Sequence, residues 1–238
     1  MSADHTGSGD TGPGDTGAGD TGAGDTGAGN TGPDVTAAGS NGAARTLRAD
    51  AQRNREQLLA AAVMAFSRDA DVTLESIARE AGVGIGTLYR HFPSREALVD
   101  AAYRSELARL CDSVPGLLEC MPADQAMRTW MDRFIEYMST KRGMADALKM
   151  VIASGGNPFA ESRSRLLAAF SALLAAGAAD GTMRADVTSA DLLASMSGVA
   201  MAAGDPSQRP QAGRLLDLLM DGLRHGAGSA TGNAGSRG

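Results

Sequence analysis

The chain has 238 residues, of which 43% are hydrophobic, and a formal net charge of −6. It contains no run of about 18 apolar residues and no signal-peptide pattern after Met1, so we expect a cytoplasmic protein with no membrane partner. Residues 1–44 hold six aspartates and no Lys or Arg. The rest of the chain is therefore close to neutral, and its acidity does not exclude a nucleic-acid partner.

Both ends of the chain lack residues that could form a core. From Gly9 to Pro33 the sequence repeats with a period of five, reading GDTGP, GDTGA, GDTGA, GDTGA and GNTGP. Because little apolar surface can be buried there, the entropy lost on ordering is not offset. We expect residues 1–44 to be a disordered tail, and residues 226–238, of similar composition, to be a second one.

The first predicted helix begins with Asp50 as its N-cap and ends near Ser67. Its apolar residues recur at helical spacing and form one stripe, made of Leu58, Leu59, Ala62, Ala65 and Phe66. Arginines gather around its start, at positions 45, 48, 53 and 55. This cluster either contacts an anionic partner or is simply a solvated helix start.

A helix-turn-helix is predicted over Thr73–Phe92, which reads TLESIAREAGVGIGTLYRHF. Thr73 is a suitable N-cap for the first helix. Gly82 permits a left-handed turn, the small Ala78 lets the second helix cross closely, and Leu88 fills the core between the helices. Such a unit presents the exposed residues of its second helix to the major groove of DNA. The sequence therefore predicts a DNA-binding protein.

The remaining sequence reads as further helices, without any β alternation. Ser94 is a suitable N-cap for a helix that ends near Cys111. Later helices are predicted over Ala123–Thr140, Gly143–Ser154, Glu161–Gly177, Ala190–Ala203 and Gln208–Leu223. We therefore expect an all-α chain, with a three-helix DNA-binding domain over residues 45–95 and a second helical domain over residues 96–225.

The segment Gly82–Phe92, GVGIGTLYRHF, followed by PSREAL, resembles the recognition helix and the next helix start of TetR/AcrR-type bacterial transcription regulators. The resemblance covers about Asn54–Ala102. Two features depart from the family pattern. The connector Asp69–Val72 lacks the usual Gly-aromatic turn, and Gly84 stands where Ser is common, so the recognition helix lacks a side-chain cap.

The resemblance implies DNA contacts at matching positions. Base edges would be approached by Ile85, Gly86 and Thr87. The sugar-phosphate backbone would be contacted by Thr73, Tyr89, His91 and Arg95. Apart from the resemblance, Arg90 faces outward by helical periodicity and is a further candidate, as are Arg48 and Arg53 of the arginine cluster. Because Ile85 and Gly86 have no side-chain donors, readout would depend on thymine methyl groups, close backbone approach and Thr87. Alternatively, Tyr89 and His91 pack between the helices.

The resemblance also implies a helical bundle that binds a small-molecule effector between its central helices and dimerises through its last two helices. Candidates for the effector pocket are Trp130, Phe134, Tyr137, Met138, Met150 and Phe170, because apolar pockets favour aromatic and Met side chains. Candidates for the dimer interface are Leu192, Met196, Val199, Leu215 and Leu219. Each of these residues could equally belong to an ordinary core.

We therefore expect a homodimeric repressor that binds a palindromic operator and is released from it by an unidentified small molecule. A ligand-independent dimeric DNA-binding protein is one alternative, and a helical-bundle enzyme is another. Bundle enzymes can hold two metal ions through Glu-x-x-His pairs, but none of His5, His91 and His225 follows such a Glu. We predict no catalytic residue, metal or cofactor. Cys111 and Cys120 are either incidental thiols or a redox pair.

Overall fold

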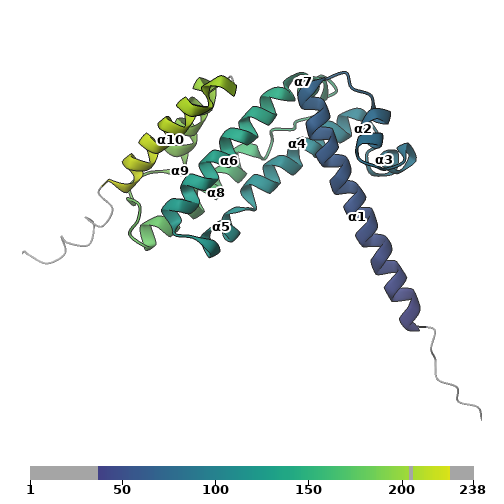
Figure 1. The fold of residues 1–238 in the computed structure, drawn as a ribbon, viewed down its shortest axis with the longest axis horizontal. Coiled ribbons are helices and arrows are strands. Elements are labelled where there is room, and N and C mark those ends of the chain that lie inside the picture. Colours follow the sequence, from purple (N-terminus) through teal and green to yellow (C-terminus); the bar gives the residue numbers. More distant parts are fainter. Residues whose placement is uncertain (1–36, 204–205, 226–238) are drawn as a thin grey trace, which may run out of the picture. The chain divides into compact units, whose positions relative to one another are not determined.

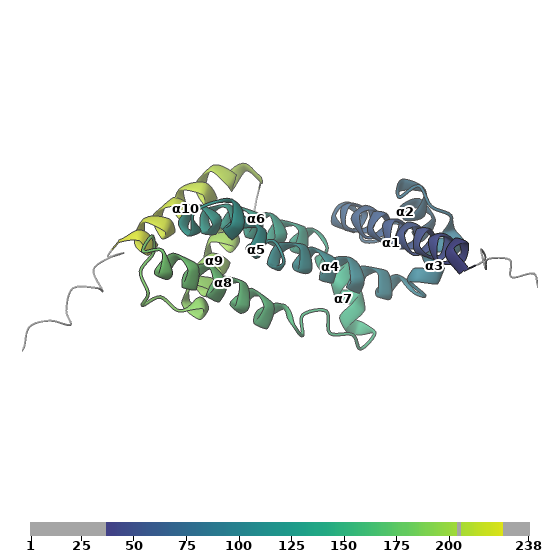
Figure 2. The ribbon, with the colours of Figure 1, turned by 90° about the horizontal axis from the view of Figure 1, so that it is seen from below.

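The computed structural model describes residues 37–203 and 206–225. Most of the tail predicted at residues 1–44, namely residues 1–36, and the whole tail predicted at residues 226–238 lie outside the described residues. Its elements in chain order are α1 (Ala37–Arg68), α2 (Leu74–Glu80), α3 (Ile85–His91), α4 (Arg95–Cys111), α5 (Val114–Cys120), α6 (Ala123–Gly143), α7 (Ala145–Ala153), α8 (Ser162–Ala179), α9 (Ser189–Ala202), η1 (Pro206–Gln208) and α10 (Arg209–Arg224). The described residues include no strand, which confirms the predicted all-α class (Figures 1 and 2). None of their helices is long and apolar enough to cross a membrane.

The helix α1 begins at Ala37, well before the predicted cap at Asp50. Residues 37–44, predicted to belong to the disordered tail, instead form the first turns of α1. They include several alanines, and alanine has the highest helix propensity. Asp50 lies within the helix, where its carboxylate accepts a hydrogen bond of 3.2 Å from Arg53 instead of capping. From Ala44 onward the chain forms one compact unit.

The second half of α1 packs with α2 and α3 around a small core. Leu58 and Phe66 of α1, Ile77 of α2 and Leu88 of α3 have no exposed surface. The turn between α2 and α3 passes through Gly82, whose φ of +70° lies in the left-handed region that was predicted there. This part of the chain is therefore the helix-turn-helix that the sequence predicts.

Both predicted caps in this region are confirmed. The Thr73 side chain accepts a hydrogen bond of 3.2 Å from the N–H of Ser76. The Ser94 side chain accepts one of 3.1 Å from the N–H of Ala97. Gly84 caps α3 without a side-chain hydrogen bond, as expected for a glycine at a position where Ser is common. The starts of α2, α3 and α4 are thus fixed by local sequence.

The helix α4 leads from the helix-turn-helix into the second part, where it packs against α6, α7 and α8. An aromatic cluster fills the centre: Trp130 and Phe134 of α6 and Phe170 of α8 are at most 1% exposed. The short helix α5 was not predicted between the helix that ends near Cys111 and the helix over Ala123–Thr140. Pro115 lies in the first turn of α5, where its missing N–H has no helical partner to lose.

The last two helices, α9 and α10, pack against α6 and against each other (Figure 2). Arg142, at the end of α6, donates hydrogen bonds to the carbonyl oxygens of Ala200 at 2.5 Å and Ala203 at 3.3 Å. These carbonyls end α9 and have no partner within their own helix. The end of α6 is thereby joined to the end of α9.

Candidate nucleic-acid interface

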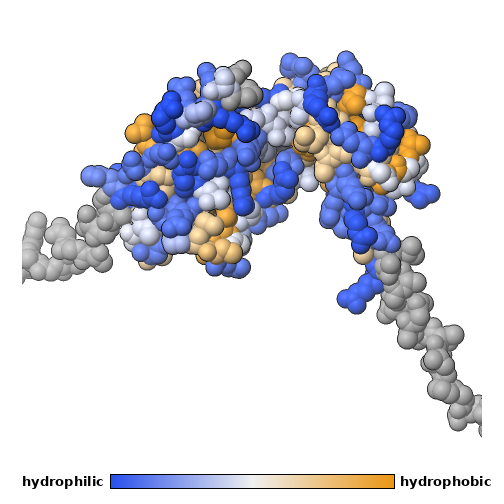
Figure 3. All heavy atoms as spheres, in the orientation of Figure 1, coloured by the Kyte–Doolittle hydropathy of each residue, from blue (hydrophilic) through white to orange (hydrophobic). Residues whose placement is uncertain are grey.

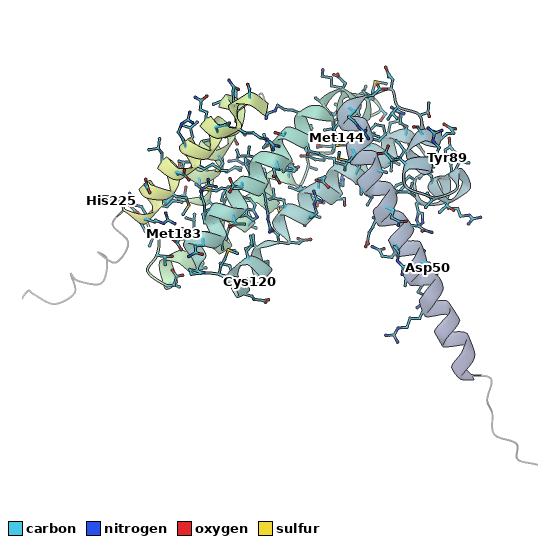
Figure 4. The ribbon with its side chains drawn as sticks, viewed as in Figure 1. Asp50, Tyr89, Cys120, Met144, Met183 and His225 are labelled. Atoms are coloured by element: carbon cyan, nitrogen blue, oxygen red, sulfur yellow. The ribbon has the colours of Figure 1, made fainter. Side chains whose placement is uncertain are left out.

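One side of α3 faces solvent and the other closes the core. Leu88 is fully buried, whereas Ile85 is 37% exposed and Tyr89 is 48% exposed. Gly86 and Arg90 are also exposed. We call Ile85, Gly86, Tyr89 and Arg90 the recognition face. Tyr89 points away from the body of the domain (Figure 4), and hydrophobic surface is visible over α2 and α3 (Figure 3).

The other predicted contacts on α3 are less accessible. Thr87 and His91 are half-buried, and the His91 ring lies 6.1 Å from the Phe92 ring, measured between centroids. The packing alternative therefore fits His91 better than Tyr89, which forms no hydrogen bond or ring contact among the described residues. Tyr89 is thus available to a partner.

The two glycines at the start of α3, the cap residue Gly84 and Gly86 in the first turn, are not required by the fold. A Cβ atom built at Gly84 or Gly86 meets no atom within 4 Å. Neither residue has the positive φ that excludes other side chains; the described glycines with positive φ are Gly82, Gly155 and Gly181. Gly86 also lowers helix propensity. The fold itself therefore does not require a glycine at either position.

Thr73 is exposed at the start of α2, where its hydroxyl oxygen caps the helix. The hydroxyl proton remains free to donate to an acceptor outside the protein. A single threonine can therefore fix the helix start and contact a phosphate at the same time.

Arg95, predicted to contact the DNA backbone, also makes contacts within the protein. Its guanidinium donates hydrogen bonds to the carbonyl oxygens of Ala70 and Val72, and its carbon Cζ lies 4.9 Å from the centre of the Phe66 ring. These contacts direct the side chain into the connector between α1 and α2 instead of outward. This connector lacks the Gly-aromatic turn that is usual in TetR/AcrR-type regulators. The contacts of Arg95 hold the connector in place instead.

The arginines of α1 divide into two kinds. Arg48 and Arg53 are exposed, and Arg53 forms a solvent-exposed ion pair with Asp50 at 3.2 Å. Such a pair contributes little stability and can exchange for another anion. Arg55 instead packs its guanidinium carbon 5.3 Å from the centre of the Phe92 ring, at the end of α3. Sequence spacing could not separate Arg55 from the others, because this contact joins residues far apart in the chain.

The predicted effector-pocket residues mostly fill the core. The Trp130 and Phe170 ring centroids are 4.7 Å apart, and the Trp130 indole donates a hydrogen bond of 3.0 Å to the Leu110 carbonyl. Phe134 packs beside both rings, with centroid distances of 5.9 and 6.1 Å. Met150 was predicted to line the pocket, but it lies on the outer side of α7 and is 60% exposed.

Two of the six pocket candidates border open depressions. Tyr137 borders a cleft of about 360 Å³ between α4 and α6, whose other walls include Glu106, Arg109 and Arg133. The Tyr137 hydroxyl itself points inward to the Tyr103 hydroxyl, 2.6 Å away. Met138 borders a separate, mainly apolar groove of about 240 Å³ beside α7.

The predicted dimer residues also divide between two sides of their helices. Leu192, Met196 and Val199 are at most 8% exposed and pack within the chain, in agreement with the core alternative. Leu215 and Leu219 are half-exposed. Fully outward positions are instead occupied by Ala194, Gly198, Met201 and Leu218, with Met201 and Leu218 exposed by 78% and 67%. We call Ala194, Gly198, Met201, Leu215, Leu218 and Leu219 the outer apolar face.

Comparison with known proteins agrees with this architecture. Residues 58–102 match the family described as bacterial regulatory proteins, tetR family. Residues 122–225 match a family described as transcriptional regulator SbtR-like, C-terminal domain. The two matches cover the helix-turn-helix and the second helical part.

Solved structures extend the similarity over most of the chain. The TetR transcriptional regulator SCO0520 from Streptomyces coelicolor is 57% identical, with a TM-score of 0.69 over 71% of this chain and 98% of that one. A TetR transcription regulatory protein from Mycobacterium vanbaalenii is 33% identical, with a TM-score of 0.62 over 75% of this chain and 99% of that one. These similarities show that the chain belongs to the TetR family of helix-turn-helix transcriptional regulators, which are DNA-binding proteins and not enzymes.

Proposed function

We propose that the protein is a homodimeric repressor that binds a palindromic operator and leaves it when a small molecule binds. The recognition face is the observation that supports this proposal. It combines exposed side chains with Gly86, which has free space around it, on a helix that faces solvent. Ile85, Gly86 and Thr87 meet base edges in the proposed complex. Thr73, Tyr89, Arg90 and His91 contact the backbone of the DNA, and Arg48 and Arg53 neutralise phosphates from α1.

The outer apolar face supports the homodimer. Exposed residues such as Met201 and Leu218 are costly to leave in water, and burying them against a second copy gains about 25 cal/mol per Å² of apolar surface. The small Ala194 and Gly198 let two helices approach closely. A two-fold dimer would place two recognition faces on half-sites about 34–36 Å apart, which explains the proposed palindrome.

Release by an effector requires two conformations with different affinities for the small molecule. The effector binds in the second helical part, which is large enough to hold a site separate from both the recognition face and the outer apolar face. A repressor whose DNA-bound form disfavours the effector would release its operator as the effector concentration rises.

Genome-wide mapping of the native protein on DNA, followed by gel shift on the most enriched site, tests the proposal. We expect an enriched palindromic motif that is bound by two copies, and increased transcription of the adjacent gene when the protein is deleted. Salt-sensitive coating of DNA without an enriched motif would contradict sequence-specific regulation. Decreased transcription after deletion would show an activator instead of a repressor.

A further inference from the structure

A groove of about 240 Å³ lies where α6 meets α7, beside the loop that leads to α8. Its volume corresponds to about eight water molecules at ~30 Å³ each, which suits a small ligand. Its apolar surface comes from Met138, Leu148, Ile152 and Phe159. Leu148 is 2% exposed and anchored in the core, whereas Ile152 is 49% exposed at the rim. The groove thus has a fixed floor and an open edge.

The charged groups that border the groove are cationic. The Lys141 amino nitrogen lies 4.5 Å from the centre of the Phe159 ring and 5.9 Å from that of Tyr103. It forms no ion pair or hydrogen bond with any described residue, although an ammonium group has three donors. Lys149, at the same groove, pairs with Asp146 at 2.8 Å, but both side chains are 74% exposed, so this pair exchanges easily. Arg142 is occupied by the carbonyl oxygens that end α9.

We propose that this groove binds a small amphipathic carboxylate. The carboxylate accepts hydrogen bonds from the Lys141 ammonium, with Lys149 within reach at the rim. The apolar body of the ligand covers Met138, Ile152 and Phe159. A cationic molecule of the same size would be repelled by Lys141. A neutral alcohol can accept a hydrogen bond from Lys141 but does not neutralise its charge, so the site favours an anion.

The groove is next to the contact between α6 and the DNA-binding part. Gly143, two residues after Lys141, lies so close to the end of α1 that an added Cβ atom would be 3.0 Å from both Cβ and O of Ser67. The Ser67 hydroxyl is buried there without a hydrogen-bond partner. Met144, the next residue, has no exposed surface and fixes the junction of α6 and α7 in the core (Figure 4). A ligand that shifts this junction therefore displaces the end of α1.

The coupling between ligand binding in the groove and DNA binding rests on the proposed function, whereas the binding site itself does not. Binding is tested on the full chain without DNA, using sodium octanoate as the probe and octanol and octylamine as matched neutral and cationic compounds. The ¹³C-methyl NMR signal of Met138, identified by its loss in Met138→Leu, reports the groove, and isothermal titration calorimetry gives the affinity. We expect octanoate to shift this signal, and the other two compounds to bind at least about tenfold more weakly.

Two variants locate the site and one serves as a control. Lys141→Gln removes the positive charge. Ile152→Asp, at an exposed position, removes apolar contact with the body of the ligand and places a negative charge that repels its carboxylate. We expect each to weaken octanoate binding by roughly tenfold. Met150→Ser changes a similarly exposed residue on α7 outside the groove and should leave octanoate binding unchanged. Absence of octanoate binding, equal binding of all three compounds, or binding that both groove variants leave intact would overturn the proposed site.

The coupling is measured by gel shift on the enriched DNA site. Saturating octanoate should weaken DNA binding by a factor between about 5 and 150, the usual range for coupled sites. Octanoate binding without any change in DNA affinity would overturn the coupling and leave the site intact. A protein that binds no specific DNA without octanoate would instead contradict the proposed function, and the NMR result would still decide the site.

Discussion

The Arg95 guanidinium donates a hydrogen bond of 2.5 Å to the Val72 carbonyl, across 23 residues of sequence. Val72 directly precedes Thr73, which caps α2. Arg95 therefore joins the start of α4 to the start of the helix-turn-helix. We infer that Arg95 positions the DNA-binding unit and does not itself neutralise a phosphate.

Replacing Arg95 with Met should weaken both folding and DNA binding. The substitution retains most of the apolar stem but removes hydrogen bonds donated by a charged group, so we expect a loss of about 1–3 kcal/mol in the free energy of unfolding. Because no phosphate contact is lost, the slope of log K against log salt concentration should stay unchanged. Urea unfolding measures the stability, and fluorescence anisotropy on labelled DNA at several salt concentrations measures the affinity and its slope.

Arg90→Ala is the matched control, since Arg90 is exposed on the recognition face. If Arg90 contacts a phosphate, its loss should reduce the magnitude of the salt slope by about one while leaving stability unchanged. A reduced slope for Arg95→Met as well would show that Arg95 reaches the DNA after all.

Gly86→Ala should stabilise the protein and yet weaken DNA binding. The new methyl group meets nothing within 4 Å, and alanine in place of a helical glycine gains about 0.5–1 kcal/mol. On the recognition face the same methyl group would stand between α3 and the DNA. Thermal unfolding and gel shift, measured on the same preparation, should therefore change in opposite directions.

Gly116→Ala provides the comparison, because Gly116 lies in α5 and its added Cβ also meets nothing within 4 Å. It should change stability in the same direction without affecting DNA affinity. If Gly86→Ala binds the same DNA with full affinity, close approach at Gly86 is excluded.

The parts of the fold that were predicted correctly depend on local sequence. Thr73, Gly82 and Ser94 each fix a cap or a turn through neighbours a few residues away, so pattern alone located the helix-turn-helix. The orientation of Arg95 depends on Ala70 and Val72, which lie 25 and 23 residues earlier, and no local pattern indicates such contacts. The expectation that Met150 lines a pocket does not fit its exposure, for a related reason. A Met residue indicates an apolar environment, but the sequence does not say which side of α7 the rest of the chain covers.

The dimer candidates show a second limit of prediction from residue type and spacing. Leu216, Met220 and Leu223 are buried on α10 and Leu215 is half-buried against the core, whereas Leu218 lies on the outer side. The leucine-rich sequence supplies two apolar sides, and only packing shows which one the chain itself covers. The side that remains outside is the one available to a second copy.

Leu218→Arg should convert the proposed dimer into a monomer. Leu218 is 67% exposed, so the substitution costs little in the isolated chain, but in the dimer it would bury a charge without a partner. Sedimentation velocity should show the smaller species, and DNA affinity should fall because one recognition helix alone binds weakly. Met150→Arg, at a 60% exposed position on α7, should leave the dimer intact. A dimeric Leu218→Arg protein would place the interface elsewhere.

Cys111 should be slow to alkylate at neutral pH. Burial raises the pKa of the Cys111 thiol to about 11, with nearby Arg165 lowering it and Asp112 raising it. The thiolate is the reactive form, so the rate should increase as the pH rises toward 11. Cys120 is exposed (Figure 4) and should be alkylated first. Peptide mass spectrometry after timed iodoacetamide treatment follows both sites. Equal rates at pH 7.5 would contradict the protection of Cys111 by burial.

Tyr137→Phe should destabilise the protein at neutral pH and reduce its sensitivity to alkali. The Tyr137 hydroxyl is hydrogen-bonded to that of Tyr103 at 2.6 Å, and Tyr103 in turn to Ser162 at 3.1 Å. Loss of one buried hydrogen bond costs about 0.5–1.5 kcal/mol. Trp130, the single tryptophan, is fully buried and reports unfolding in urea by its fluorescence.

The pH effect follows from the pKa of Tyr137, which burial and then the Tyr103 hydrogen bond raise well above its ordinary value. The unfolded chain loses this proton near pH 10, whereas the folded chain retains it, so stability falls as the pH rises above about 10. The phenyl ring introduced by Tyr137→Phe cannot titrate, and the stability difference between the two proteins should therefore shrink from about pH 7 to about pH 10.5. Tyr89→Phe, which alters an exposed hydroxyl, should match the stability of the unmodified protein at pH 7. A stability difference between Tyr137→Phe and the unmodified protein that stays constant with pH would show that the Tyr137 hydroxyl ionises as easily in the folded chain as in the unfolded one.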